Sequence, residues 1–130
     1  MSSTIASMMH TNVRTAGMDD TIASVEQLMK DRELSWVPVL ESDGPVLGVI
    51  SATDLLQFHA QHRDADDVRA WQLCTYKPIA VAPTASIEEV ASLMVRHHVH
   101  HVVVIEGQAL RGVVSALDFV GKFASDGHES

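Results

Sequence analysis

Apolar residues recur along the chain at two different spacings. In residues 21–32, TIASVEQLMKDR, and in residues 86–97, SIEEVASLMVRH, apolar side chains return every three or four positions, as on one face of an α-helix. Each of these segments is followed by a run rich in β-branched residues, WVPVLE at 36–41 and HVVVIE at 101–106. These runs have the length and composition of strands. The pattern therefore predicts two amphipathic helices, each followed by a strand.

Turn residues extend both segments into the same larger unit. ESDG at 41–44 and EGQ at 106–108 predict hairpin turns, and VLGVIS at 46–51 and LRGVVS at 110–115 predict the partner strands. A final helix begins at SATDLLQF in one unit and at SALDFVGKF in the other, and a short extended segment, NVRTAG or KPIAVAP, precedes each first helix. The predicted order in each unit is strand–helix–strand–strand–helix.

The two units are copies of one another. GVISATD at 48–54 returns as GVVSALD at 112–118, and a shift of 65 residues aligns the first helices and first long strands. The second turn is one residue shorter, which reduces the shift to 64 for the repeated phrase. One register kept over roughly 40 residues indicates a tandem duplication. Because one unit alone leaves a face of its sheet uncovered, we expect the two sheets to pack together.

Composition and charge narrow the possible functions. The chain has 130 residues, 46% of them hydrophobic, and a formal net charge of −8. An acidic surface disfavours binding to a nucleic acid duplex or to an anionic membrane. No apolar run reaches the roughly 18 residues of a membrane span, and the N-terminus lacks the pattern of a secretory signal. The single cysteine, Cys74, excludes an internal disulfide framework. We therefore expect a cytoplasmic protein.

Several motifs that occur in both copies give the chain a family resemblance. They are the lead-ins MMHTNVRTA and LCTYKPIAV, the helices that contain Leu-Met, the segment WVPVLESDGPVLGVIS and the closing Ser-x-x-Asp. In this order they resemble a pair of CBS domains, also called a Bateman module, over about residues 5–123. The resemblance implies an α/β (α+β) fold in which two β-α-β-β-α repeats pack sheet to sheet as a pseudo-twofold disc with two clefts.

The repeats also define the expected domain boundaries. We expect a first CBS repeat with its N-terminal lead-in at 1–62, a solvated charged linker at 63–70, a second repeat at 71–123 and a flexible tail at 124–130. The resemblance further implies a homodimer formed through the helical faces, with an unidentified effector protein as the partner that receives the signal.

The repeated Ser-x-x-Asp motif has two explanations. At the start of a helix, Ser51 with Asp54 and Ser115 with Asp118 have the spacing of a capping box, which requires no ligand. In addition, the resemblance implies that the clefts bind an adenosine-containing ligand, AMP, ADP, ATP or S-adenosylmethionine. Asp54 and Asp118 would then accept hydrogen bonds from ribose hydroxyls, and Ser51, Thr53 and Ser115 would contact ribose or phosphate. The residues that would form walls for the adenine are Thr15, Ala16, Val49, Ala80, Val81 and Val113.

The histidine-rich segment RHHVHH, residues 96–101, has three interpretations. His100 and His101 fall where nucleotide-binding relatives place basic residues that face phosphates, which predicts tighter phosphate binding below about pH 6.5. His97 with His100 or His101 also has the spacing of metal ligands on a helix, so metal binding by the His97–His101 cluster is an alternative. Finally, basic side chains at a helix C-terminus are favoured by the helix dipole without any ligand.

The motifs that are present favour a regulatory protein over an enzyme. The sequence shows no catalytic triad and no phosphate-binding glycine loop, and we expect no required cofactor. The prediction is therefore a regulatory module that binds an adenosyl nucleotide. The alternative is a ligand-free CBS scaffold that serves dimerisation and interaction.

Overall fold

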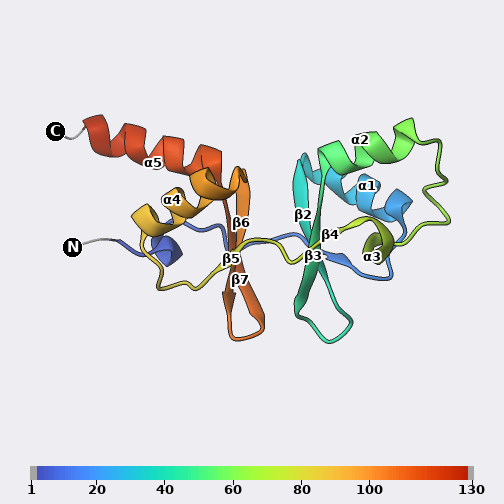
Figure 1. Cartoon of the computed structure of the whole chain (residues 1–130), viewed down its shortest axis with the longest axis horizontal. Coiled ribbons are helices and arrows are strands. Elements are labelled where there is room, and N and C mark those ends of the chain that lie inside the picture. The colour runs from blue at the N-terminus through green and yellow to red at the C-terminus, as the bar shows by residue number, and fades with distance from the viewer. Residues whose placement is uncertain (1–2, 129–130) are drawn as a thin grey trace. The chain divides into compact units, whose positions relative to one another are not determined.

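The computed structural model describes residues 3–128 and has a mixed α+β architecture in two compact units (Figure 1). The first-repeat unit consists of residues 14–78. The second-repeat unit combines the N-terminal segment up to Val13 with the chain from Ile79 onward. Among the helices between residues 3 and 128, none has the length and apolar character needed to cross a bilayer.

The first-repeat unit has a four-stranded sheet in the order β1-β2-β3-β4. Strand β1 pairs with β2 in parallel, and the other two pairings are antiparallel. The elements in chain order are β1 (Ala16–Gly17), α1 (Ile22–Arg32), β2 (Trp36–Leu40), β3 (Val46–Ser51), α2 (Ala52–Ala60), α3 (Ala70–Leu73) and β4 (Thr75–Tyr76).

The second-repeat unit has a three-stranded sheet in the order β5-β6-β7, with β5 parallel and β7 antiparallel to β6. Its elements are η1 (Ile5–Ser7), β5 (Ala80–Val81), α4 (Ile87–His97), β6 (His101–Glu106), β7 (Ala109–Ser115) and α5 (Ala116–His128). The predicted order strand–helix–strand–strand–helix is therefore confirmed in both repeats, as β1-α1-β2-β3-α2 and as β5-α4-β6-β7-α5.

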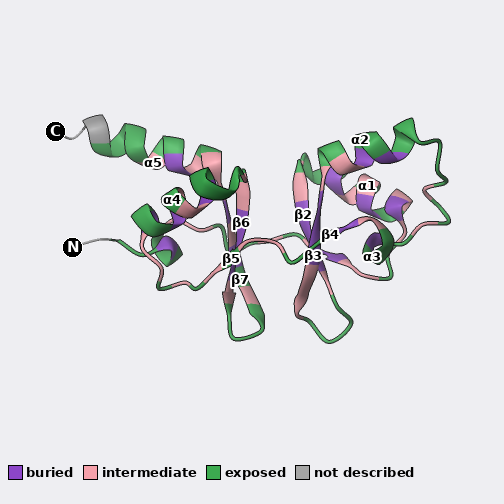
Figure 2. Cartoon of the chain, viewed as in Figure 1, coloured by how far each residue is buried: buried purple, intermediate pink, exposed green. Residues whose placement is uncertain are grey.

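The helix stripe predicted from the sequence forms the core of each unit. Ile22, Val25 and Met29 of α1 are 5% exposed or less and pack against Val37 and Val39 of β2. Figure 2 shows in purple the buried residues on the helices and strands of both units. The residues that align with these five in the second repeat have equally low exposure and form its core: Ile87, Val90, Met94, Val102 and Val104. The duplication thus repeats core positions as well as sequence.

The first half of each lead-in pairs with the sheet of the other repeat, whereas its last residues, in β1 or β5, pair with the sheet of their own repeat. The N-terminal segment bonds to β7, where His10 forms a bridge with Val113. Its counterpart before the second repeat forms β4, which pairs Thr75 with Val49 of β3. The predicted division assigns each lead-in to the repeat that follows it in sequence, whereas the boundaries of the compact units, after Val13 and after Pro78, fall within the lead-ins and exchange only their first parts. Buried apolar contacts account for the exchange, because Ile5 is fully buried in the core of the second-repeat unit.

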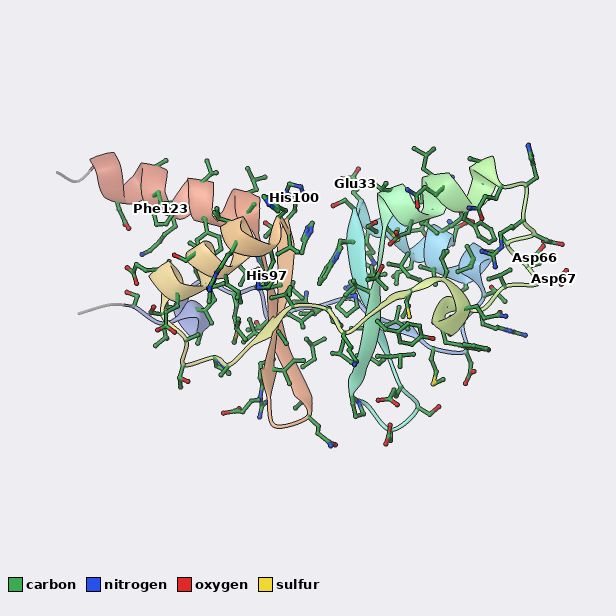
Figure 3. The ribbon with its side chains drawn as sticks, in the orientation of Figure 1. Glu33, Asp66, Asp67, His97, His100 and Phe123 are labelled. Carbon is green, nitrogen blue, oxygen red and sulfur yellow. The ribbon has the colours of Figure 1, made fainter. Side chains whose placement is uncertain are left out.

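The segment 63–70, expected to be a solvated linker, also supports α1. The carbonyl oxygens of Ala65 and Val68 accept hydrogen bonds from the amides of Ala23 and Ile22, at 3.0 and 2.9 Å. These bonds satisfy N–H groups of the first helical turn, which have no partners within the helix. The acidic side chains between them are exposed, as Asp66 and Asp67 show in Figure 3. The segment is therefore charged on its outer side and bonded on its inner side.

Helix α5 extends further than the sequence predicts. The expected tail begins at residue 124, whereas α5 continues to His128, and residues 129 and 130 lie outside the described residues. Two contacts at helical spacing support the extension. The ring centroids of Phe119 and Phe123 are 6.0 Å apart, and Lys122 Nζ lies 3.7 Å from Asp126 Oδ2.

Candidate functional site

Helix α2 begins with a complete capping box. The hydroxyl of Ser51 accepts a hydrogen bond from the Asp54 amide at 3.2 Å, and Asp54 Oδ2 accepts one from the Ser51 amide at 2.8 Å. Helix α5 begins in the same way, with distances of 3.3 Å for the Asp118 amide and 2.7 Å for the Ser115 amide. The capping interpretation of Ser-x-x-Asp is therefore confirmed in both repeats. It engages Oδ2 of each carboxylate once, so the oxygen with the most capacity left for a ligand is Oδ1.

The second oxygen of Asp118 is bonded to the N-terminal lead-in. His10 Nε2 lies 2.8 Å from Asp118 Oδ1. Partial burial by itself would raise the pKa of Asp118, but the hydrogen bonds from His10 and from Ser115 outweigh this effect and lower it. Asp118 is therefore ionised at neutral pH, and both of its oxygens are engaged.

The second oxygen of Asp54 has a different environment. Within residues 3–128, the Asp54 carboxylate accepts one hydrogen bond, the capping bond from the Ser51 amide. Cys74 of the second lead-in interacts electrostatically with Asp54: burial is the main cause that raises the pKa of the Cys74 thiol, and the charge of Asp54 raises it further. A half-buried carboxylate with one available oxygen can accept hydrogen bonds from a ligand hydroxyl.

The glycine that begins both GVISATD and GVVSALD is explained by the lead-in segment that packs closely against it. A Cβ added to Gly112 would lie 2.7 Å from the His10 carbonyl oxygen and 2.8 Å from Met9 Sδ. A Cβ added to Gly48 would lie 2.8 Å from Cys74 Sγ and would also overlap the Thr75 carbonyl oxygen. The sequence marked these glycines only as part of a repeated phrase. Their role depends on a chain segment remote in sequence, which no local pattern reveals.

The predicted adenine walls divide between the two faces of each sheet. Thr15, which precedes β1, and Val49 of β3 lie outside the apolar core cluster, whereas Ala16 is 2% exposed and packs within it. In the second repeat Ala80 is exposed and Val113 is half-buried, whereas Val81 packs against the core. Successive side chains of a strand point to opposite faces, so adjacent residues cannot form one wall. Ala16 has almost no side-chain surface to offer a ligand, whereas Val81 is half-buried, and the part of both residues in an adenine wall stays a prediction.

The remaining hydroxyl residue, Thr53, lies in the first turn of α2 and is exposed. It is one residue before Asp54, so its hydroxyl is available to a ligand bound at that helix start. At the corresponding position of α5 stands Leu117, which is 76% exposed and apolar. The two helix starts therefore differ in hydrogen-bonding capacity on their outer side as well.

The histidines of the 96–101 segment are spread over three structural contexts. His97 ends α4, and His98 adopts the left-handed conformation with φ of 54° that terminates the helix. His100, which is exposed, accepts a hydrogen bond from the Ala116 amide through its carbonyl oxygen at 2.8 Å, so its backbone helps to begin α5 (Figure 3). His101 lies in β6 opposite Ser115.

The local environment of His101 determines when it carries a charge. Its ring is half-buried, and burial followed by the neighbouring His100 lowers the pKa of His101, against an opposing effect of Asp118. Any phosphate contact that requires protonated His101 therefore needs a pH lower than the 6.5 expected from sequence. Within the described part of the chain, no group of three or more His, Cys, Asp or Glu side chains is arranged to hold a metal ion.

An apolar groove lies between α4 and α5 of the second-repeat unit. Its volume is about 570 Å³. Val95, Val120 and Phe123 line it and are 75%, 61% and 50% exposed. Phe123 projects from α5 in Figure 3. Exposed apolar groups of this size on adjacent helices are typical of interaction surfaces.

Comparison with known proteins identifies the family. The chain matches the CBS domain family twice, over residues 5–60 and 68–125. It is 28% identical over 100 residues to protein YlbB of Bacillus subtilis, an alignment that spans 76% of this chain and 68% of YlbB. It is 32% identical over 107 residues to the gamma-3 subunit of 5'-AMP-activated protein kinase of Sus scrofa, which spans 76% of this chain but 21% of that subunit.

A solved structure with the same fold is the CBS domain pair of protein MJ0100, in complex with 5'-methylthioadenosine and S-adenosyl-L-methionine. The TM-score is 0.87 over 97% of this chain and 99% of that one, at 16% sequence identity. At this identity the similarity establishes the fold. Because the family match covers most of the sequence in two copies, the chain belongs to the CBS domain family.

Proposed function

We propose that this protein is a regulatory module that binds an adenosine-containing ligand, such as AMP, ADP, ATP or S-adenosylmethionine, and transmits its binding to a partner protein. CBS domain pairs are generally regulatory rather than catalytic. We define the Asp54 site as Thr15, Val49, Ser51, Thr53 and Asp54. We define the Asp118 site as Ala80, His100, His101, Val113, Ser115 and Asp118.

The observation that carries the proposal is the half-buried carboxylate held at each helix start. The capping box fixes the Asp54 carboxylate through Oδ2, at 2.8 Å from the Ser51 amide. Its other oxygen can accept the hydroxyls of a ribose, which present two donors on adjacent carbons. The first-turn amides of α2 and the Thr53 hydroxyl are donors suited to a phosphate or carboxylate of the same ligand. Val49 on β3 is 9% exposed, so only a small part of its side chain is open to contact with a base.

The relatives support this ligand class. One structural neighbour is a CBS domain pair bound to 5'-methylthioadenosine and S-adenosyl-L-methionine, and another is CBSX2 in complex with AMP. A sequence relative is a subunit of a kinase named for its activation by 5'-AMP. These ligands share the adenosine group and differ at the 5' position. The proposal therefore specifies the nucleoside and leaves the 5' substituent to experiment.

Signalling follows from differential binding. A ligand that bonds to a helix start and to strand residues of one site favours the conformation in which those groups are correctly spaced. It can shift a conformational equilibrium only by as much as its affinity differs between the two states. The partner protein would bind one of these states more tightly than the other.

The test is a thermal shift panel with AMP, ADP, ATP and S-adenosylmethionine. A ligand at 100 times its dissociation constant should add about 2.7 kcal/mol to the free energy of unfolding. Asp54→Asn combined with Asp118→Asn should abolish the shift, because an amide accepts fewer hydrogen bonds and carries no charge. Asp43→Asn combined with Asp67→Asn is the matched control, since both residues are exposed in turns and the two substitutions also remove two negative charges. A panel in which no adenosine compound alters the melting of the unmodified protein would refute the proposal.

The second candidate function is that of an assembly scaffold, and the apolar groove between α4 and α5 favours it. We propose that a second copy of the chain covers this groove to form a homodimer. Phe123→Asp should then convert the dimer into a monomer in analytical ultracentrifugation, whereas Gln57→Asp, on an exposed position of α2, should leave it unchanged. A monomeric unmodified protein would exclude this assembly.

A further inference from the structure

We propose that His10 is a specificity-determining residue of the Asp118 site, where its imidazole competes with ribose hydroxyls for the Asp118 carboxylate. This inference rests on the proposed function. It predicts that the two sites are unequal, with the Asp54 site taking the adenosine ligand first.

The geometry around Asp118 supports the competition. Its Oδ2 is engaged by the Ser115 amide at 2.7 Å, and its Oδ1 lies 2.8 Å from His10 Nε2. Each oxygen of Asp118 keeps a further lone pair, but the imidazole already occupies the side of Oδ1 away from the capping bond, so a ribose hydroxyl competes with His10 for that position. The hydrogen bond that a ribose hydroxyl gains to the carboxylate is offset by the loss of the bond from His10, so the ligand gains less at Asp118 than at Asp54.

The backbone of His10 is fixed, whereas its ring is accessible. The His10 amide donates to the Val113 carbonyl at 2.9 Å, and the Val113 amide donates to the His10 carbonyl at 3.0 Å. The close contact with Gly112 restricts this segment further. In contrast, the His10 side chain is 65% exposed. A ligand can therefore displace the ring by rotation of the side chain, but it cannot displace the lead-in without breaking the bridge.

The first repeat provides an internal comparison. Thr75 pairs with Val49 on β3 just as His10 pairs with Val113 on β7. Both residues also place their carbonyl oxygens against the glycine that precedes these valines. His10 and Thr75 are thus equivalent positions of the exchanged lead-ins. Thr75 is exposed, and no hydrogen bond from its side chain to Asp54 is recorded within residues 3–128.

Other charged groups near Asp118 do not remove the asymmetry. His101 of β6 interacts electrostatically with Asp118, and His100 lies beside His101. At the corresponding positions in the first repeat stand Trp36 and Ser35, which are not titratable. The imidazole that forms a hydrogen bond with the carboxylate is nevertheless that of His10. Substitution of His10 therefore tests this one contact while leaving β6 unchanged.

The experiment exchanges the two lead-in residues. AMP, or the adenosine compound of largest effect in the panel, is titrated by isothermal calorimetry into the unmodified protein, His10→Thr and Thr75→His. We expect His10→Thr to raise the affinity of the weaker site about tenfold and Thr75→His to lower the affinity of the tighter site by a similar factor. Asp118→Asn added to His10→Thr should cancel the gain, and Asp54→Asn should remove the tighter site.

A conservative variant separates competition from a structural role. His10→Gln keeps a side-chain N–H donor, so it should stay close to the unmodified protein if the imidazole acts as a competing donor. If His10→Thr and His10→Gln behave alike, or if neither exchange alters AMP binding, the inference about His10 is overturned while the proposed function stands. If the unmodified protein and every variant fail to bind any adenosine compound, the proposed function fails and the inference with it.

Discussion

The two repeats have the same fold but present different helix starts. Both place a Ser-x-x-Asp capping box after a strand, and both bring a lead-in against the glycine three residues before the serine. In the first repeat the lead-in presents Thr75, and in the second it presents His10, which bonds to Asp118. The comparison shows that duplication conserved the elements that position the carboxylate. The lead-in residue that pairs with the strand before the carboxylate has diverged.

The largest loss of stability is expected when the lead-in contact that both repeats share is obstructed. Gly48→Ala and Gly112→Ala should each lower the free energy of unfolding by about 1–3 kcal/mol, because the added methyl group overlaps backbone atoms that cannot rotate away. Urea denaturation measures the loss.

Gly121→Ala is the matched control for both substitutions. This glycine lies on an exposed position of α5 with no atom near an added Cβ, so the change should be neutral or should stabilise the helix by up to about 1 kcal/mol. Equal stability of all three variants would contradict the role assigned to the lead-ins.

This glycine contact also marks the limit of what the sequence could predict. Local periodicity identified α1, α4 and the long strands, because amphipathic stripes and β-branched runs are properties of contiguous residues. The capping boxes were likewise visible as a local spacing. The exchange of lead-ins was not predicted, because a two-residue strand such as Thr75–Tyr76 carries almost no periodic signal. Its partner strand is remote in sequence.

In the candidate site too, local motifs could be predicted from the sequence, whereas contacts with remote segments could not. The residues of the Ser-x-x-Asp motif lie where the sequence places them. His10 was missed because nothing in MMHTNVRTA indicates that its side chain meets an aspartate 108 residues later. The alignment of the copies could have directed attention to it, since it pairs His10 with Thr75. The burial of Ala16 in the core was not predicted, because its two-residue strand was too short to reveal which face it presents.

A second prediction separates the two carboxylates by stability in the absence of ligand. Asp118→Asn should cost about 1 kcal/mol more than Asp54→Asn, because it weakens the contact with His10 in addition to the capping box. The exposed position of His10 limits the difference, since solvent screens the pair.

Thermal or urea denaturation of the two variants provides the measurement, and His10→Thr provides the control. In the background of His10→Thr, the two substitutions should become equal. A difference that persists there would assign the extra stability to another partner of Asp118.

A third prediction concerns the helix ends, where the repeats are alike. Glu33 and His98 both adopt φ of 54° at the C-terminal caps of α1 and α4. Left-handed conformation is unfavourable for residues with a Cβ and is the usual position of glycine. Glu33→Gly and His98→Gly should each stabilise their unit by about 0.5–1 kcal/mol, measured by urea midpoint. Similar gains would confirm that the C-terminal caps of α1 and α4 are equivalent. Loss of stability in His98→Gly alone would show that the His98 side chain makes a contact of its own.

The smallest expected effect is the pH dependence that His101 contributes to stability. The pKa of His101 is lowered by burial and by the neighbouring His100, against the effect of Asp118. Between this lowered pKa and the ordinary value near 6.5, the unfolded chain binds a proton that the folded chain does not. The contribution of His101 to stability is therefore full above about pH 6.5 and is lost as the pH falls below it.

Urea midpoints at pH 7.5, 6.5 and 5.5 should fall less steeply for His101→Gln than for the unmodified protein. His97→Gln, at an exposed position on the last turn of α4, controls for removal of an imidazole. The corresponding position of the first repeat holds Trp36, which does not titrate and therefore adds nothing to the change of the urea midpoint with pH. If His101→Gln and the unmodified protein lose stability in parallel, the desolvated ring is not the origin of the pH dependence, and the electrostatic difference between the repeats reduces to His10.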